Sequence, residues 1–298
     1  MSGTDDKGRA SGGLALSFEV FPPKNDAQAD QISKVAASLE TFDPAFISVT
    51  YGAGGSTRER SIATIHRLAG ETSVPLAAHL TCVGASRRTL ERVIDDIRSI
   101  GVERFVVLRG DSPDGIGAPY RPHRDGYQDT ADLVRHLKAT GASDISVSAY
   151  PERHPDSPDW QADLDTLKRK VDAGANRAIT QFFFDNDDYQ SYVRRVRAAG
   201  LSIPIVPGIL PIHNINAVRN FAARCGASLP ETVLERFDGL DPSTVEHRRT
   251  AVEIAQEQIE GLLARNVGAF HFYTLNRDNL VVPLCRWLQR SAPKSQPA

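Results

Sequence analysis

Eight short runs rich in β-branched and aromatic residues recur along the chain, and longer stretches with helical spacing and charged positions separate them. Strands that alternate with helices pair in parallel through right-handed crossovers. Eight such units close into a barrel, so the sequence predicts an α/β fold, a (β/α)8 TIM barrel. We expect the strands at residues 14–21, 46–52, 76–82, 105–111, 145–151, 177–185, 203–210 and 269–276.

The segments between the strands have the apolar periodicity of helices that cover a sheet on one side. The helix expected over residues 162–173 is followed by Gly174, and glycine suits the left-handed position that ends a helix. The connection over residues 230–260 is long, and we expect an extra helix there before the last strand. In residues 86–100 the apolar positions fall on one helical face; they are Leu90, Val93, Ile94, Ile97 and Ile100.

One domain accounts for the whole pattern. The 298 residues fall within the range of a single α/β barrel, and neither a flexible linker nor a shift in composition interrupts the alternation. A hydrophobic share of 41% is enough for a sizeable core. We expect a disordered N-terminal tail over residues 1–13, a catalytic barrel over residues 14–290 and a loose C-terminal tail over residues 291–298.

Charge and cysteine content restrict the partners. A net charge of −2 with mixed signs lacks the basic surface that nucleic acid or an anionic membrane requires, so we expect small-molecule ligands, no nucleic acid and no membrane. The first 13 residues have no apolar core, which argues against a signal peptide or a spanning helix there. Three widely spaced cysteines fit neither a disulfide framework nor a zinc site, so we expect no metal and a cytoplasmic location; they are Cys82, Cys225 and Cys285.

Polar side chains gather toward the carboxyl end of the expected strands. Strand residues alternate between two faces, and the first strand turns its apolar set to the helices, which leaves Glu19 at the end of the inward set. In barrel enzymes the active site lies at this rim. The same alternation turns inward Ser17, Ser48, Thr50, Ala77, His79, Thr81, Val107, Arg109, Asp111, Ser146, Ser148, Tyr150, Ile179, Gln181, His271 and Tyr273, with Arg277 in the following loop.

Each of these residues also has a purely structural interpretation. Glu19 alone is more often a surface carboxylate, and His79 alone is more often a buried imidazole with satisfied hydrogen bonds. Convergence from seven strands favours a ligand site, because buried charges without partners are costly. Two alternatives stay open. The turn at residues 52–56 either presents amides to a phosphate or is only tight, and Arg169 and Lys170 either hold phosphate or are solvated helix charges.

Eight stretches resemble the methylenetetrahydrofolate reductase family, and together they span residues 17–277. The resemblance is to the bacterial form, and it implies a barrel that binds FAD at its rim, without the glycine-rich turn of a Rossmann unit. The stretches are SFEVFPPK (17–24), ISVTYGAGGSTR (47–58), HLTC (79–82), LRGD (108–111), AYPERHP (149–155), LKRKVDAGANRAITQFFFD (167–185), PGILP (207–211) and HFYTLNR (271–277).

The reaction that the resemblance implies is a ping-pong reduction. NADH or NADPH reduces FAD, leaves, and is replaced by 5,10-methylenetetrahydrofolate, which becomes 5-methyltetrahydrofolate and supplies methyl groups for methionine synthesis. By the resemblance, Glu19 is the general acid that helps to open the methylene bridge, and its pKa is raised. Asp111 lies between flavin and pterin, where a carboxylate orients the pterin by hydrogen bonds.

The resemblance also implies binding residues and a homo-oligomeric assembly. Arginine and lysine suit the pyrophosphate of FAD, and Asp163 suits a sugar hydroxyl. The FAD set is Thr50, Tyr51, Ala53, His79, Arg109, Gly110, Asp111, Tyr150, His154, Asp163, Arg169 and Lys170. The substrate set is Glu19, Asp111, Gln181, Phe221, Tyr273 and Arg277.

The sequence departs from the family pattern at two places, and two rival functions remain. Residues 112–127 are longer than the corresponding loop of the family, and Thr166 stands where Asn is expected beside the cofactor. A flavin-free barrel lyase or aldolase is disfavoured because no expected strand ends in a lysine for a Schiff base. A non-catalytic folate-binding relative is disfavoured by the joint presence of Glu19, Asp111 and Gln181.

Overall fold

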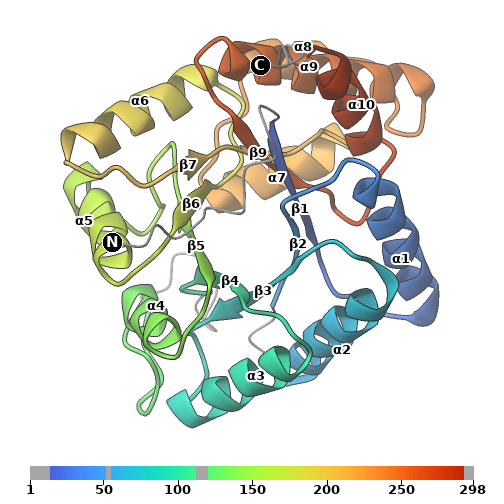
Figure 1. Cartoon of the computed structure of the whole chain (residues 1–298). Helices are drawn as coiled ribbons and strands as arrows, with labels where there is room; N and C mark the ends of the chain where they lie inside the picture. The colour runs from blue at the N-terminus through green and yellow to red at the C-terminus, as the bar shows by residue number, and fades with distance from the viewer. Residues whose placement is uncertain (1–13, 52–54, 112–119, 292–298) are drawn as a thin grey trace, which may run out of the picture.

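Parallel strands form a ring at the centre of the molecule (Figure 1). The computed structural model describes residues 14–51, 55–111 and 120–291, so residues 1–13, 292–298 and part of the turn at 52–56 lie outside the described residues. The strands pair in the order β7-β6-β5-β4-β3-β2-β1-β9-β8. Their bounds are β1 (Ala15–Val20), β2 (Phe46–Val49), β3 (Leu76–Thr81), β4 (Arg104–Leu108), β5 (Asp144–Ala149), β6 (Arg177–Thr180), β7 (Ile205–Val206), β8 (Gly208–Ile209) and β9 (Ala269–Tyr273).

The ring closes at a proline. The strand expected at residues 203–210 is two short strands, β7 and β8, on either side of Pro207. β7 pairs with β6 and β8 pairs with β9, so one bent segment joins both ends of the sheet. Proline has no N–H group to donate, but the Pro207 carbonyl accepts a hydrogen bond from His271 N at 3.0 Å. The eightfold parallel barrel is confirmed, with one strand position split in two.

Helices form a layer outside the ring (Figure 1). Several begin with a side-chain cap: Ser86, Asp129 and Asp159 each accept a hydrogen bond from the backbone N–H three residues later. In the described residues no helix is long and apolar enough to cross a membrane. The bounds are α1 (Asp26–Glu40), α2 (Gly55–Glu71), α3 (Arg87–Ser99), α4 (Thr130–Ala139), α5 (Trp160–Asp172), α6 (Asn186–Ala198), α7 (Ile215–Cys225), α8 (Glu231–Glu235), α9 (Val245–Leu263) and α10 (Val281–Ser291).

Three helices, α7, α8 and α9, lie between β8 and β9. The long helix α9 packs against α6 and α10 and completes the outer layer. The short helix α8 confirms the extra helix expected within residues 230–260, whereas α7 begins before that range and was not expected. Ile215, Val218 and Ala222 of α7 pack in one apolar cluster with Phe182, which follows β6. This contact places α7 beside the carboxyl ends of the strands.

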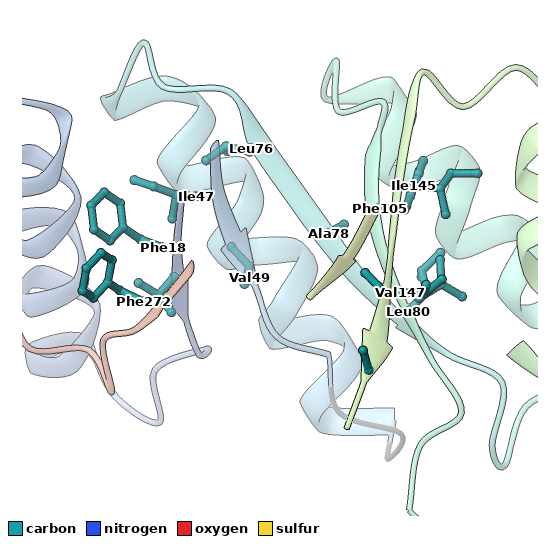
Figure 2. Close-up of a cluster of buried hydrophobic side chains, with 14 of the residues drawn as sticks. Phe18, Ile47, Val49, Leu76, Ala78, Leu80, Phe105, Ile145, Val147 and Phe272 are labelled. Carbon is teal, nitrogen blue, oxygen red and sulfur yellow. The ribbon is translucent and has the colours of Figure 1, made fainter. Parts of the chain in front are cut away.

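The main core lies between the ring and the helices. The outward faces of the strands carry apolar side chains that pack together with helix residues (Figure 2). Phe18 of β1 and Phe272 of β9 stack with their ring centroids 5.8 Å apart. The apolar face expected in residues 86–100 is confirmed, because α3 buries Leu90, Val93, Ile94 and Ile97.

A smaller apolar layer fills the inside of the ring and corrects one expectation. Val106 belongs to this inner layer and Leu108 packs against it, whereas Val107 belongs to the outer core, so the expected phase of β4 is wrong. The strand ends at Leu108, and Arg109 and Asp111 lie beyond it. After Arg104, every residue of the run RFVVL is apolar. The sequence therefore does not show which side chains of this strand point into the barrel and which point to the helices.

Charged side chains join the amino-terminal ends of β4, β5 and β6. Asp144 forms an ion pair with Arg104, and it accepts a hydrogen bond from Arg177 Nη1 at 2.9 Å. Asp144 is 9% exposed, so its carboxylate is largely shielded from solvent, whereas both arginines are partly exposed. This ionic cluster closes the end of the barrel opposite the polar rim, where packing and pairing serve stability.

Candidate active site

A cavity of about 250 Å³ opens at the carboxyl ends of the strands, and we name it the mouth cavity. Its lining comes from β1, β3, β4, β5, β6 and β9, from the residues directly after β2, β5, β6 and β9, and from α7. The convergence expected at the rim therefore occurs. The residues from the expected site sets that line it are Glu19, Thr50, Tyr51, His79, Tyr150, Gln181, Phe221 and Tyr273.

Glu19 lies between two histidines in the mouth cavity. Its Oε2 atom is 3.4 Å from His79 Nε2 and 3.8 Å from His271 Nε2. The other ring nitrogen of His271 is 2.8 Å from Ser17 Oγ, which fixes the orientation of the imidazole. Burial lowers the pKa of His79 to about 4, so this ring is neutral at pH 7.

The same neighbours shift the pKa of Glu19. Burial raises this pKa, but a hydrogen bond with His271 and the electrostatic interactions with His79 and His271 lower it, and it lies below its ordinary value. The raised pKa that the resemblance implied is therefore wrong for the protein without ligands. The physical reason is that two imidazoles stabilise the carboxylate more than burial disfavours it.

Aromatic side chains form one wall of the mouth cavity. Phe221 of α7 stacks on Phe182, with ring centroids 5.2 Å apart, and is 37% exposed. The hydroxyl of Tyr273 donates a hydrogen bond to the Thr180 carbonyl at 2.7 Å, which anchors the ring from β9. This wall presents flat apolar surface opposite polar groups, an arrangement that suits a heteroaromatic ring.

A second cavity, of about 270 Å³, lies between α4, α5 and the end of β5, and we name it the basic cavity. Ser148 and Tyr150 line both cavities, so the two are adjacent. Neither alone reaches the roughly 300–1,000 Å³ of a typical ligand pocket. The residues from the expected FAD set that line the basic cavity are Arg109, Tyr150, His154, Asp163, Arg169 and Lys170.

Lys170 brings a charge into the buried side of the basic cavity. Its Nζ atom donates hydrogen bonds to the carbonyl of Ser148 at 3.0 Å and to the hydroxyl of Ser148 at 3.2 Å. Burial lowers the pKa of Lys170 to about 8, so the amino group is mostly protonated at pH 7. Asp163 lies about two turns before Lys170 on α5. It accepts hydrogen bonds from His154 N at 3.1 Å and Ser157 Oγ at 3.0 Å.

Comparison with known proteins identifies the family of the chain. The chain matches the model of the methylenetetrahydrofolate reductase family over residues 6–289. It is 41% identical to the 5,10-methylenetetrahydrofolate reductase of Pectobacterium carotovorum subsp. carotovorum over 277 residues, which cover 93% of this chain and 91% of that relative. The chain belongs to the methylenetetrahydrofolate reductase family.

The family membership gives the activity. The 5,10-methylenetetrahydrofolate reductase of Escherichia coli (strain K12) is 40% identical over 277 residues, which cover 93% of this chain and 91% of that relative. This chain has methylenetetrahydrofolate reductase activity and produces 5-methyltetrahydrofolate. The comparisons therefore favour the reductase over the two alternatives from the sequence analysis, a barrel lyase or aldolase and a non-catalytic folate-binding relative.

A solved structure shows the same fold at low identity. An uncharacterized protein from Clostridium thermocellum that binds two copies of 5-methyl-5,6,7,8-tetrahydrofolic acid superposes with a TM-score of 0.66 and 12% identity. The match covers 93% of this chain and 96% of that protein. The likeness supports the single-domain barrel of parallel strands.

Some residues expected at the reductase site lie outside the two cavities. Asp111 is exposed and lines neither, and Arg277 lines a separate depression beside the mouth cavity. Gly110 lies next to the basic cavity with φ +85°, and a Cβ atom there would be 2.4 Å from Val83 Cγ1, so glycine is required. Ala53 lies outside the described residues.

Other residues of the reductase site escaped the sequence-based prediction. Asp156 holds the guanidinium of Arg109 at 2.6 Å, and Tyr120 lies under the same guanidinium with its ring centroid at 5.1 Å. Asp156 follows Arg109 by 47 residues and Tyr120 follows it by 11, and neither spacing belongs to one helix or strand, so no local periodicity indicates these pairings. Thr166, the departure noted in the sequence, lines the basic cavity and donates its hydroxyl to Ala162 O at 2.8 Å.

Proposed function

We propose that this reductase binds FAD across the mouth and basic cavities and reduces 5,10-methylenetetrahydrofolate with NADH or NADPH. When bound, FAD supplies the hydride relay of a ping-pong reaction, accepting from the nicotinamide and passing to the folate. The observation that carries the proposal is that Ser148 and Tyr150 line both the basic cavity, which holds Lys170, and the mouth cavity, which holds Glu19.

The residues of the two cavities suit the two ends of FAD. One cavity holds a buried lysine that suits a pyrophosphate, and two arginines that would have to share their charge between it and their present partners, Asp156 and Asp129. Asp163 suits a sugar hydroxyl. In the other cavity the buried Nε2 atom of His79 lies 3.4 Å from Glu19 Oε2 but forms no hydrogen bond with any described residue, so it can still bind a polar ring edge. Thr50 and Tyr51 line the same cavity and would border that ring.

Glu19 is the proposed general acid. The folate substrate needs a proton on a nitrogen of its methylene bridge before the bridge opens, and a carboxyl group in the mouth cavity can deliver it. A pterin stacked there excludes water, which favours the neutral form and raises the pKa of Glu19 from its lowered value in the open site. His79 and His271 then hold the carboxyl group in place.

The remaining substrate residues are proposed to hold the folate and the nicotinamide in place. Gln181, Phe221 and Tyr273 line the cavity around Glu19 and would contact the folate, and Gln181 would contact the nicotinamide in its turn. Asp111 is proposed to orient the pterin from the exposed end of the β4 loop. We further infer a cytoplasmic homo-oligomer from the resemblance, which analytical ultracentrifugation of the purified protein tests for the assembly.

Glu19→Gln separates the two half-reactions. We expect the variant to bind FAD and to be reduced by NADH or NADPH at the normal rate, because the amide keeps the size of the side chain. Transfer to 5,10-methylenetetrahydrofolate should fall by at least about a hundredfold, because the acid is lost. Anaerobic stopped-flow absorbance of the flavin measures both steps.

The control for this experiment is Glu260→Gln, an exposed substitution on α9 that should leave both steps unchanged. Normal folate reduction in Glu19→Gln would remove Glu19 from the mechanism. A purified protein that is colourless and takes up no FAD would overturn the cofactor proposal as a whole.

A further inference from the structure

A buried serine and a buried histidine lie behind Glu19, and the serine has no assigned role. Ser17 is two residues before Glu19 on β1, and His271 lies opposite Ser17 on β9. Ser17 is 5% exposed and His271 is 1% exposed, so both side chains depend on protein groups for their hydrogen bonds. The three side chains form a chain of contacts in the order Ser17, His271, Glu19.

The ring of His271 has little freedom to turn. Its centroid lies 6.0 Å from that of Phe46 on β2 and 5.4 Å from that of Tyr273 on β9. Close packing of this kind holds a side chain in one orientation. Nδ1 of the ring is 2.8 Å from Ser17 Oγ, and Nε2 is 3.8 Å from Glu19 Oε2. Each ring nitrogen therefore has its own fixed neighbour.

The contacts of Ser17 indicate which ring nitrogen of His271 carries a proton. A neutral imidazole has one N–H group and one acceptor nitrogen, and a serine hydroxyl has one hydrogen to donate. Two acceptors compete for that hydrogen, His271 Nδ1 at 2.8 Å and the Phe270 carbonyl at 3.4 Å. The shorter contact is the better hydrogen bond, so the hydroxyl donates to Nδ1 and the proton of the neutral ring lies on Nε2.

We propose that Ser17 is a positioning residue, which holds the ring proton of His271 on the side of Glu19 and thereby sets the pH range in which Glu19 works as an acid. A ring N–H group beside a carboxylate stabilises its charged form, whereas a bare ring nitrogen would accept a hydrogen bond from the neutral carboxyl group. Ser17 disfavours the second arrangement, because the hydroxyl would have to turn to the more distant Phe270 carbonyl. The inference rests on the proposed role of Glu19.

The titratable groups that act on Glu19 come from two other strands. His79 of β3 is neutral at pH 7, because burial lowers its pKa to about 4. Burial and the charge of Glu19 raise the pKa of Tyr273, which lies on β9 beside His271, so the Tyr273 hydroxyl keeps its proton. Ser17 forms its hydrogen bond with His271, so a substitution of Ser17 changes the surroundings of Glu19 through that ring.

Ser17→Ala should move the pH dependence of folate reduction. The rate of this step falls as the pH rises through the pKa of Glu19 in the folate complex, because the acid loses its proton. Without the hydroxyl, Nδ1 of His271 can take the ring proton when Glu19 is neutral, so the fall should occur about 0.5–1 pH unit higher. Flavin reduction by NADH should keep its rate. Anaerobic stopped-flow absorbance between about pH 6 and 9 measures both steps.

Ser48→Ala and Ser17→Thr are the controls. Ser48 is buried on β2 opposite Glu19, and its hydroxyl donates to the Phe18 carbonyl at 3.3 Å and to no described histidine. Its loss should leave the pH dependence unchanged. Ser17→Thr keeps the hydroxyl and should restore the pH dependence of the unchanged enzyme. No shift in Ser17→Ala, or an equal shift in Ser48→Ala, would overturn the proposal.

A direct measurement locates the ring proton without an activity assay. NMR of the histidine nitrogens in the isotope-labelled protein distinguishes a protonated from an unprotonated ring nitrogen, and His271→Gln identifies the signals of this ring. In the unchanged protein the neutral ring should carry its proton on Nε2. A proton on Nδ1 would overturn the proposal, even where Ser17→Ala fails to fold. Normal folate reduction in Glu19→Gln would count against the proposed function instead, and it would leave the NMR result as it is.

Discussion

Lys170 shows how one residue can favour a ligand while opposing the folded state without it. The residue is 6% exposed, and its amino group loses most of its hydration in exchange for hydrogen bonds to Ser148. An unfolded chain holds the same proton up to the ordinary pKa of 10.5, whereas the folded chain loses it near pH 8. Between these two values the unfolded state binds more protons, so this group makes the ligand-free protein more stable as the pH rises.

The affinity for FAD should have the opposite pH dependence. The ammonium form of Lys170 attracts a pyrophosphate, and this form is lost as the pH rises through about 8, so FAD affinity should fall there. Lys170→Met should weaken FAD binding at pH 7 by about tenfold or more, flatten the pH dependence, and leave the ligand-free protein as stable as before or more stable. Fluorescence titration with FAD between pH 6.5 and 9 and thermal unfolding measure the two effects.

Lys168→Met is the matched control for this substitution. Lys168 lies on the same helix, is exposed, and pairs with Asp172 at 2.9 Å, so its loss should change neither FAD affinity nor its pH dependence. An equal loss of affinity in both variants would mean that the general charge of α5, and not the buried ammonium, attracts the ligand.

Among the strands and helices, the sequence predicted those features that follow from a local alternation of polar and apolar residues. The alternating strand that carries Glu19 and the amphipathic helix α3 have the expected faces, because their polarity changes with a clear period. The phase of β4 was unpredictable because Val106 and Val107 have the same polarity. The same holds for the site: Glu19 lies near the end of the alternating strand β1 and Gln181 directly follows β6, whereas Arg109 reaches the basic cavity beside a turn at Gly110 that no periodicity describes.

The split strand also depends on a contact that sequence patterns do not contain. Pro207 signals an interruption, but the reason that the chain can turn there is Gly208, which lies against β6 and β9 at once. A Cβ atom on Gly208 would be 2.3 Å from the Thr180 carbonyl and 2.5 Å from Cε2 of Tyr273. Only glycine therefore permits this closure of the barrel.

Gly208→Ala should test the closure. The added methyl group forces β6 and β9 apart, and we expect a loss of about 1–3 kcal/mol in the free energy of unfolding. Gly268→Ala is the control, because no atom lies within 4 Å of its Cβ position and its φ is not left-handed, so its effect should be small. Denaturant unfolding followed by circular dichroism gives both values, and equal stabilities of the two variants would contradict the role of Gly208.

For the whole molecule, stability and catalysis are separated along the barrel axis. The carboxyl ends of the strands hold Glu19 and both cavities, and the amino ends hold the ionic cluster of Asp144, Arg104 and Arg177. Groups at the second end touch no cavity of the site, so changes there should alter the fraction of folded protein and not its turnover.

Asp144→Asn should separate the two properties. Loss of the carboxylate leaves two arginines near each other without a counter-charge, and we expect unfolding to become easier by about 2 kcal/mol. The kcat of the folded fraction should stay unchanged. Asp238→Asn, an exposed substitution, should change neither stability nor kcat. Thermal unfolding and steady-state assays give the two quantities, and a large fall in kcat at 25 °C would contradict the separation.

The pairing of β1 with β9 governs when the active site can assemble during synthesis. Ser17 and His271, which meet in this pairing, are 254 residues apart in the chain. A ribosome that adds about 5–20 residues each second needs roughly 13–50 s to produce that length. Over this interval the strand that carries Glu19 has one unpaired edge, and its length of six residues limits the surface that it offers to other nascent chains.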